Sequence, residues 1–331
     1  MDDAELLKVV NLRKYFPATK TLFGRVKNFV KAVDDVSFTL TKGESLGIVG
    51  ESGSGKTTLA RLVMRLVEPT SGEIYFDGVN ILSLQPDQMR NVRPKMQMVF
   101  QDPMASLNPR KRVRQTLKQV YNLHTDLSDE QIEDRMTELL EKVGLSPPEL
   151  FLERYPHELS GGQRQRICIA RAIALKPLLL IADEPVSALD VSIRGQIINL
   201  LLDIKKQFPQ MAYLVISHDI ALIKAMCQKT LVMYAGKAVE YGKTEDIIQK
   251  PLHPYTSMLL SAVPIPDPEV AKTRNRVAIT GETPSLINPP SGCRFHPRCP
   301  YVMEKCRQTP PPYLTTGDRK VSCFLYEQQQ S

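Results

Sequence analysis

The chain has 331 residues, of which 42% are hydrophobic, and it carries a formal net charge of +7. Its length exceeds that of a usual single domain, so we expect one large and one small domain. No run of eighteen apolar residues occurs, and the acidic first five residues do not resemble a signal peptide. These features predict a cytoplasmic protein. The positive charge weakly supports a location at a membrane surface.

Residues 31–100 have a strand-rich pattern that contains a phosphate-binding sequence. The apolar run 45–49 precedes Gly50-Glu51-Ser52-Gly53-Ser54-Gly55-Lys56-Thr57-Thr58, which fits G-x-x-x-x-G-K-[ST] without a mismatch. Residues 58–67 then carry apolar side chains at helical spacing, as expected of a strand–loop–helix unit.

Each group in this loop has an expected role toward ATP. Amides from Gly53 to Thr58 should surround the phosphates, and the Lys56 ammonium should reach the β and γ groups. The Thr57 hydroxyl should bind Mg²⁺, which prefers a few oxygen ligands plus water.

Helical patterning follows over residues 102–158. Its clearest helix starts at Ser128 with Gln131 three residues later and stops at Gly144. From 161 to 248, helices and short apolar strands alternate, with strands expected at 178–182 and 213–217, which predicts a parallel α/β sheet. A hairpin is expected around the turn 235–237.

Leu159-Ser160-Gly161-Gly162-Gln163 is expected to begin a helix, where free N–H groups and the helix dipole favour an anion. An ordinary helix cap is the alternative, because Ser is a favoured N-cap. This pentapeptide lies fifteen residues upstream of an acidic strand, 178–184, that ends in Asp183-Glu184. The Asp183 carboxylate should emerge at the carboxyl edge of the sheet, where open α/β sheets bind ligands.

Together these segments resemble the ATP-binding cassette (ABC) family. The resemblance implies an α/β P-loop NTPase with a RecA-like core, an antiparallel β subdomain, a helical subdomain at about 102–165 and a small loop-rich C-terminal extension. It implies that Asp183 holds Mg²⁺ through water, that Glu184 polarises the attacking water, and that the pentapeptide covers ATP held by the opposite subunit of a dimer.

Three further segments match the family in order. Gln101, after the strand ending at Phe100, resembles the Q-loop residue that touches Mg²⁺; His218 resembles the switch histidine that hydrogen-bonds the γ-phosphate; and Asp190 resembles the D-loop residue at the dimer interface. Each could by itself be an ordinary strand-end or surface residue. For the aromatic residue that the family stacks on adenine, the sequence offers Phe16, which we favour, and Tyr15; a core aromatic is the alternative.

Composition changes at Pro251, and thirteen of the 25 prolines fall in residues 251–331, so we place a domain boundary there: an ATPase domain over 1–250 and a loop-rich extension over 251–331. Pro251-Leu252-His253-Pro254-Tyr255-Thr256 and the segment 292–300 resemble the C-terminal extension of dipeptide and oligopeptide importer ATPases, specifically the F-type subunit. This implies a related D-type ATPase partner, two membrane permeases, an extracytoplasmic peptide-binding protein and a peripheral position on the cytoplasmic face of the membrane.

Four cysteines cluster in this extension: Cys293, Cys299, Cys306 and Cys323. The other two, Cys168 and Cys227, lie in apolar helical stretches and are expected in the core. Some relatives carry a [4Fe–4S] cluster at the four positions, and four thiolates suit one. Zinc or free thiols are the alternatives, although the spacing lacks the paired C-x-x-C of common zinc sites.

Two rival functions remain. One is an importer of the same build that carries nickel chelates, glutathione or sugars. The other is a soluble ATPase acting on nucleic acid, which the net charge suggests; no nucleic-acid-reading motif is evident, so we expect no nucleic-acid partner.

Overall fold

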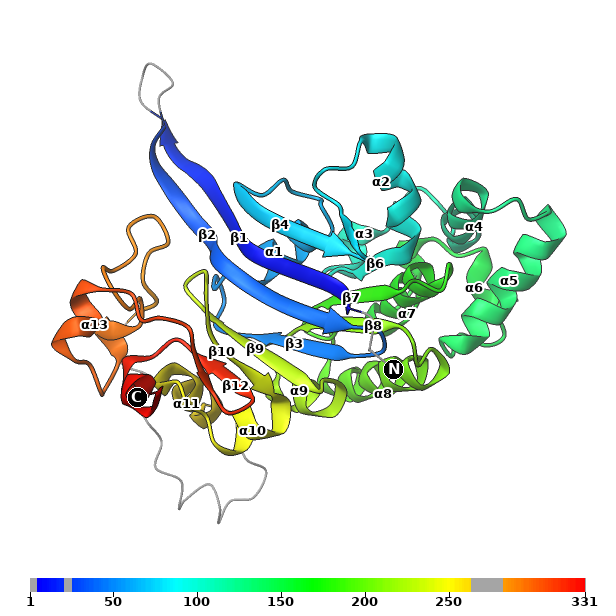
Figure 1. Cartoon of the computed structure of the whole chain (residues 1–331). Helices are drawn as coiled ribbons and strands as arrows, with labels where there is room; N and C mark the ends of the chain where they lie inside the picture. The colour runs from blue at the N-terminus through cyan, green and yellow to red at the C-terminus, as the bar shows by residue number, and fades with distance from the viewer. Residues whose placement is uncertain (1–4, 21–25, 263–281, 331) are drawn as a thin grey trace, which may run out of the picture. The chain divides into compact units, whose positions relative to one another are not determined.

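The computed structural model describes residues 5–20, 26–262 and 282–330. Within these ranges the chain forms two compact units. One contains residues 41–44 and 83–215; the other contains residues 5–40, 45–82 and the described residues from 216 onward (Figure 1). In the part of the chain that the structure describes, no helix is long and apolar enough to cross a membrane.

The first unit combines parallel strands with helices. β6 (Met96–Val99) pairs in parallel with β7 (Leu179–Asp183), and β8 (Ala212–Ile216) follows β7 in the sheet order. All five β7 residues are buried, as the near-continuous apolar run of a parallel strand predicts. Its helices are α2 (Pro86–Val92), η1 (Arg93–Lys95), α3 (Pro103–Ser106), α4 (Val113–His124), α5 (Asp129–Lys142), α6 (Glu149–Leu152), η2 (Pro156–Glu158), α7 (Gly161–Ile173) and α8 (Val191–Gln207).

The α5 helix forms as its sequence predicts. Ser128 Oγ accepts a hydrogen bond from the Gln131 N–H at 3.3 Å, and Gln131 Oε1 accepts one from the Ser128 N–H at 2.9 Å. Ile132 and Met136 are buried on one face of the helix, and Gly144 follows it with a φ of 70°. This left-handed conformation suits glycine and ends the helix.

The second unit contains two groups of strands. β1 (Glu5–Lys20), β2 (Val26–Thr41), β4 (Ser71–Phe76) and β5 (Val79–Asn80) form a sheet in the order β2-β1-β4-β5, in which β4 pairs antiparallel with β1 and β5. β3 (Ser45–Val49) pairs in parallel with β9 (Lys229–Tyr234), which forms a hairpin with β10 (Lys237–Lys243). The tail adds β11 (Leu314–Thr316) and β12 (Arg319–Val321), and β12 pairs with β10.

The helices of the second unit are short. They are α1 (Lys56–Val63), α9 (Ile220–Met226), α10 (Thr244–Gln249), α11 (Pro254–Ser261), η3 (His296–Arg298), α13 (Glu304–Gln308) and η4 (Phe324–Gln330). The sequence prediction for α1 was wrong at both ends. The helix starts at Lys56 and ends at Val63, and Arg65 has a φ of 48°, which a continuing helix does not allow. The mixture of parallel strands, helices and an antiparallel sheet confirms the predicted α/β class.

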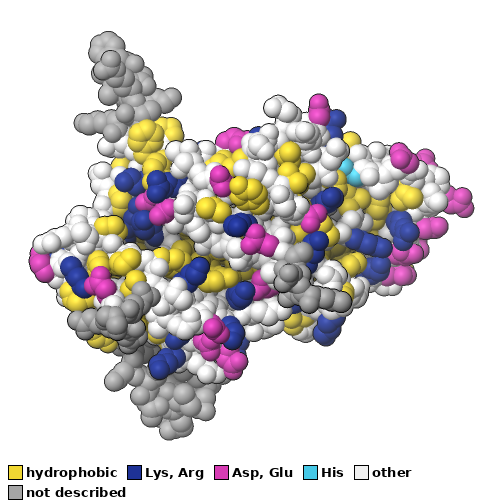
Figure 2. All heavy atoms as spheres, in the orientation of Figure 1, with side chains coloured by type: hydrophobic (Ala, Val, Ile, Leu, Met, Phe, Trp, Pro, Cys, Tyr) yellow, Lys and Arg dark blue, Asp and Glu magenta, His cyan; other side chains and the backbone are white. Residues whose placement is uncertain are grey.

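Charges of both signs are mixed on the surface that Figure 2 displays. Lys and Arg side chains (dark blue) are interspersed there with Asp and Glu side chains (magenta). The net charge of +7 therefore does not gather into a basic stripe on this face.

Candidate functional site

The phosphate loop connects β3 to α1 in the second unit, and its glycines are required by close backbone approaches. A Cβ atom at Gly50 would lie 2.2 Å from the Met233 carbonyl oxygen, and one at Gly55 would lie 2.1 Å from that of Ala32. Gly50, Gly53 and Gly55 all have positive φ. Only glycine can occupy Gly50 and Gly55, so the sequence pattern reflects a geometric requirement.

Lys56 opens α1 and folds back over the loop. Its ammonium group donates to the carbonyl oxygens of Gly50 at 2.7 Å and Glu51 at 2.9 Å. No side chain caps α1, so its first amides can receive an anion. Of the remaining predicted loop residues, Ser52 and Gly53 are exposed, Ser54 is buried, and Thr57 and Thr58 are partly exposed.

His218 belongs to the same unit as the loop. It is exposed and follows Ser217, whose N–H donates to the carbonyl oxygen of Ile48 at 3.2 Å. Ile48 lies in β3, two residues before Gly50, so His218 follows a segment bonded to the strand that leads into the loop. Asp219 caps α9 by accepting from the N–H groups of Ala221 and Leu222.

Asp183 ends β7 in the first unit, and Glu184 follows it directly. The Asp183 side chain is buried, and Glu184 has a φ of 46°, an uncommon conformation that marks a sharp departure from the strand. The Gln101 side-chain amide donates to Glu184 Oε2 at 3.3 Å. Gln101 and Glu184, which the sequence analysis predicts to be catalytic, therefore lie within hydrogen-bonding distance of each other.

The pentapeptide begins α7 in the same unit with a reciprocal cap. Ser160 Oγ accepts from the Gln163 N–H at 3.3 Å, and Gln163 Oε1 accepts from the Ser160 N–H at 2.9 Å. Gly161 is partly exposed and Gly162 is buried. Asp190 is exposed at the start of α8. Ser160 thus has a helix-cap geometry that is expected both of an anion-binding helix start and of an ordinary helix cap.

The two candidate adenine-stacking residues have different surroundings in β1. The Tyr15 hydroxyl donates to Asp34 Oδ1 at 2.6 Å, and burial together with this bond raises the pKa of Tyr15 to about 12. The Phe16 ring has no polar atom, is partly exposed and lies 4.9 Å from the Lys14 ammonium. Phe16 is therefore the less constrained of the two.

The four tail cysteines converge. They line one small cavity together with His253 and His296, and none of the six cysteines, all of which lie in the described residues, forms a disulfide. Burial, with smaller contributions from neighbouring thiols, raises the pKa of Cys293 and of Cys323 to about 11. Among the described residues, no three Cys, His, Asp or Glu side chains are arranged to hold a metal ion. The expected core positions of Cys168 and Cys227 are confirmed, since both are buried.

One contact had no sequence signal. The Arg298 guanidinium, from the tail, forms two hydrogen bonds with the carboxylate of Glu51, in the phosphate loop, at 2.8 and 2.9 Å. Glu51 occupies a variable position of the loop pattern, and 247 residues separate the pair.

Comparisons with known proteins assign the chain to a family. Residues 33–187 match the family described as ABC transporter, and residues 239–306 match the C-terminal region of oligopeptide/dipeptide transporters. The oligopeptide transport ATP-binding protein AppF of Bacillus subtilis is 48% identical over 97% of this chain and 97% of its own length. The dipeptide transport ATP-binding protein DppF of Haemophilus influenzae is 45% identical over 98% of this chain and 97% of its own length.

Solved structures show that this chain has the fold of an ATP-binding cassette. A dimeric post-hydrolysis state of the ATP-binding cassette MJ0796, bound to ADP and Pi, has a TM-score of 0.63 and 28% identity, covering 72% of this chain and 99% of that one. CbiO1 of Clostridium perfringens, part of the ABC transporter complex cbiONQ, has a TM-score of 0.62 and 26% identity, covering 75% of this chain and 92% of that one. The chain belongs to the ATP-binding proteins of the oligopeptide and dipeptide ABC transporter family.

Proposed function

We propose that this chain is the ATP-hydrolysing subunit of an importer that energises the uptake of dipeptides or oligopeptides across the cytoplasmic membrane. The observation that carries the proposal is the similarity over nearly the whole chain to ATP-binding proteins of peptide transport, including the tail. The intact phosphate loop, the acidic end of β7 and the capped pentapeptide supply the groups that ATP hydrolysis needs.

Each site residue has a proposed role. The loop amides and Lys56 bind the phosphates, Phe16 stacks on adenine, and Glu184 orients and polarises the attacking water. His218 would contact the γ-phosphate, and Thr57, Gln101 and Asp183 would hold Mg²⁺, Asp183 through water. The Gln101–Glu184 hydrogen bond supports a shared position for these two residues at the reacting end of ATP.

We further propose that the chain works as half of a dimer. Ser160, Gly161, Gly162 and Gln163 would contact ATP bound by a related D-type ATPase, while this chain's Lys56 and Glu184 would await the partner's own pentapeptide. Two permeases would hold the dimer at the cytoplasmic face of the membrane, and an extracytoplasmic binding protein would deliver the peptide. We also propose that the boundary between the ATPase domain and the C-terminal extension lies near residue 250.

The tail cysteines are proposed to hold a [4Fe–4S] cluster. Their number and type fit, because the cluster takes four cysteine thiolates and the four thiols line one cavity. A bound cluster would cross-link a proline-rich tail that has little core of its own. Iron and sulfide should be found after anaerobic purification and be lost in Cys299→Ser but retained in Cys168→Ala. A folded protein without iron, or with zinc instead, would overturn this part.

Replacing Glu184 tests the catalytic assignment. Glu184→Gln should bind ATP but slow hydrolysis by at least about a hundredfold, because it removes the group proposed to activate water. Nucleotide retained by the partnered complex and phosphate release are the measurements. Glu141→Gln, an exposed change on α5, is the matched control. Turnover close to wild type in Glu184→Gln would refute its role.

A further inference from the structure

Glu51 is fixed in the phosphate loop through each of its polar groups. Its N–H donates to the Tyr255 hydroxyl at 2.8 Å, and its carboxylate accepts from Arg298 and, at 3.1 Å, from the Thr283 hydroxyl. Its carbonyl oxygen accepts from the Lys56 ammonium. Three of these four partners lie after residue 250, so the tail holds the first turn of the loop.

Arg298 is held at this position by burial and by a further hydrogen bond. Only 7% of the residue is exposed, and it also donates to the Tyr234 hydroxyl at 3.2 Å. The Tyr234 ring packs against those of Tyr255 and Phe295, with centroids 4.5 and 5.2 Å away. A partly buried, two-pronged pair of this kind needs the planar fork of arginine, which lysine does not have.

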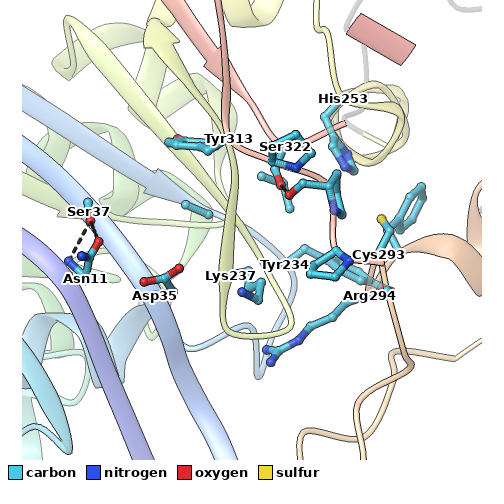
Figure 3. Close-up of a pocket in the computed structure, with 17 residues that line it drawn as sticks. Asn11, Asp35, Ser37, Tyr234, Lys237, His253, Cys293, Arg294, Tyr313 and Ser322 are labelled. Carbon is cyan, nitrogen blue, oxygen red and sulfur yellow. Dashed lines mark hydrogen bonds between the residues drawn. The ribbon is translucent and has the colours of Figure 1, made fainter. Parts of the chain in front are cut away.

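A second tail arginine supports the middle of the loop through the β9–β10 hairpin turn. Arg294 donates to the Ala235 carbonyl oxygen and pairs with Asp34. Figure 3 shows its side chain extending from the tail toward the turn of the β9–β10 hairpin, beside Lys237. In this turn the Gly236 N–H donates to the carbonyl oxygen of Ser54, a loop residue, at 2.9 Å.

We propose that Arg298 is a positioning residue of the nucleotide site, which holds the phosphate loop ready for ATP and neutralises Glu51, with Arg294 supporting the loop at Ser54 through the hairpin turn. The proposal rests on the proposed function, in that ATP binds at Gly50–Thr58. A loop with three positive-φ glycines is costly to order on binding, so a preformed loop binds more tightly. A carboxylate within this loop would repel the phosphates of ATP unless a cation paired with it.

The test is the affinity of the full-length chain for a fluorescent ATP analogue with Mg²⁺. Arg298→Gln should weaken binding about tenfold, the usual scale for losing a buried charge-assisted pair. Adding Glu51→Gln to Arg298→Gln should recover most of this loss, because it removes the unpaired carboxylate. Arg298→Lys should lie between, and Arg307→Gln, an exposed tail change, should match wild type. Rescue by a second substitution separates positioning from a general loss of folding.

Wild-type affinity in Arg298→Gln, or no recovery in the double variant, overturns the inference. If Arg298→Gln does not fold, the kinetics of Arg298→Lys test the inference instead. This variant should raise the KM for ATP and change kcat less than about twofold. Lys56→Ala separates this inference from the proposed function. If wild type itself fails to bind the analogue, or Lys56→Ala binds it equally well, the proposed nucleotide site is what fails.

Discussion

The side-chain amide of Gln101 donates to the carboxylate of Glu184 at 3.3 Å, although 83 residues separate them in the sequence. The bond holds the carboxylate that we assign to water activation. Gln101→Ala should therefore lower kcat by about tenfold or more, while the affinity for ATP changes only a few-fold. Steady-state ATPase kinetics of the partnered complex provide the measurement. An unchanged kcat would show that this contact has no part in turnover.

Gly162 packs so closely on α8 that it should not tolerate a methyl group. A Cβ there would lie 2.7 Å from Cγ2 of Ile193, whose β-branched side chain has little freedom to move in a helix. Gly162→Ala should lower the free energy of unfolding by about 1–3 kcal/mol. Urea unfolding of the full chain measures this.

The neighbouring glycine supplies the control for that experiment. A Cβ at Gly161 would meet Leu189 at 3.5 Å, an ordinary contact, so Gly161→Ala should leave the unfolding midpoint nearly unchanged. Combining Gly162→Ala with Ile193→Ala should cost less than the sum of the two single changes, because the second makes room for the methyl group. Strict additivity would contradict the proposed clash.

Phe16 and Tyr15 are the two candidates for the aromatic residue that stacks on adenine, and substitutions distinguish them. Phe16→Ala should weaken ATP binding about tenfold, since a base stacked on an aromatic ring gains roughly 1–3 kcal/mol. Tyr15→Phe should leave ATP binding unchanged but lower stability by about 1 kcal/mol, because it breaks the hydrogen bond to Asp34. Paired binding and unfolding measurements distinguish them. The reverse pattern would assign the adenine contact to Tyr15.

His253 should make stability depend on pH below neutrality. Burial lowers the pKa of His253 to about 3, whereas an unfolded histidine titrates near 6.5. Between these values the unfolded chain binds one more proton than the folded chain. The free energy of unfolding should therefore fall as the pH falls from 6.5, by up to about 1.4 kcal/mol per unit from this residue.

His253→Asn isolates this effect. His253 Nδ1 accepts from the Tyr255 N–H at the start of α11, and the Asn oxygen can take over this cap. The nearby carboxyl of Glu240, whose pKa burial raises, is present in both proteins and cancels in the comparison. Urea unfolding between pH 7 and 5 should show a shallower slope for His253→Asn, and an unchanged slope for the exposed His124→Asn. Equal slopes for wild type and His253→Asn would contradict neutral burial.

Segments with local signals could be predicted from the sequence. The cap, apolar stripe and terminal glycine of α5 lie within seventeen residues, from Ser128 to Gly144. The loop at Gly50–Thr58 likewise combines a fixed pattern with a fixed setting, and its glycines meet backbone oxygens of Met233 and Ala32. Such features are set by neighbours along the chain, or by a requirement for glycine that the sequence displays.

Other features depend on partners far along the chain. No element was predicted before residue 31, yet β1 and β2 are each sixteen residues long, with Pro17 in the part of β1 beyond its pairing with β4. The helix α2 was not predicted, because Gln85, before its start at Pro86, is not a usual capping residue; the Gln85 N–H instead donates to Gln88 Oε1 at 2.9 Å. The pairing of Arg298 with Glu51 has no local signal at all.

The most direct test of the account is the ATPase rate of the transporter reconstituted from this chain, the proposed D-type ATPase partner and the proposed permeases, with the proposed binding protein on the opposite membrane face. The account predicts that peptide-loaded binding protein stimulates hydrolysis several-fold, and that Glu184→Gln in this chain abolishes the stimulation. Stimulation by a nickel chelate or a sugar but not by peptides, or full stimulation in Glu184→Gln, would contradict it.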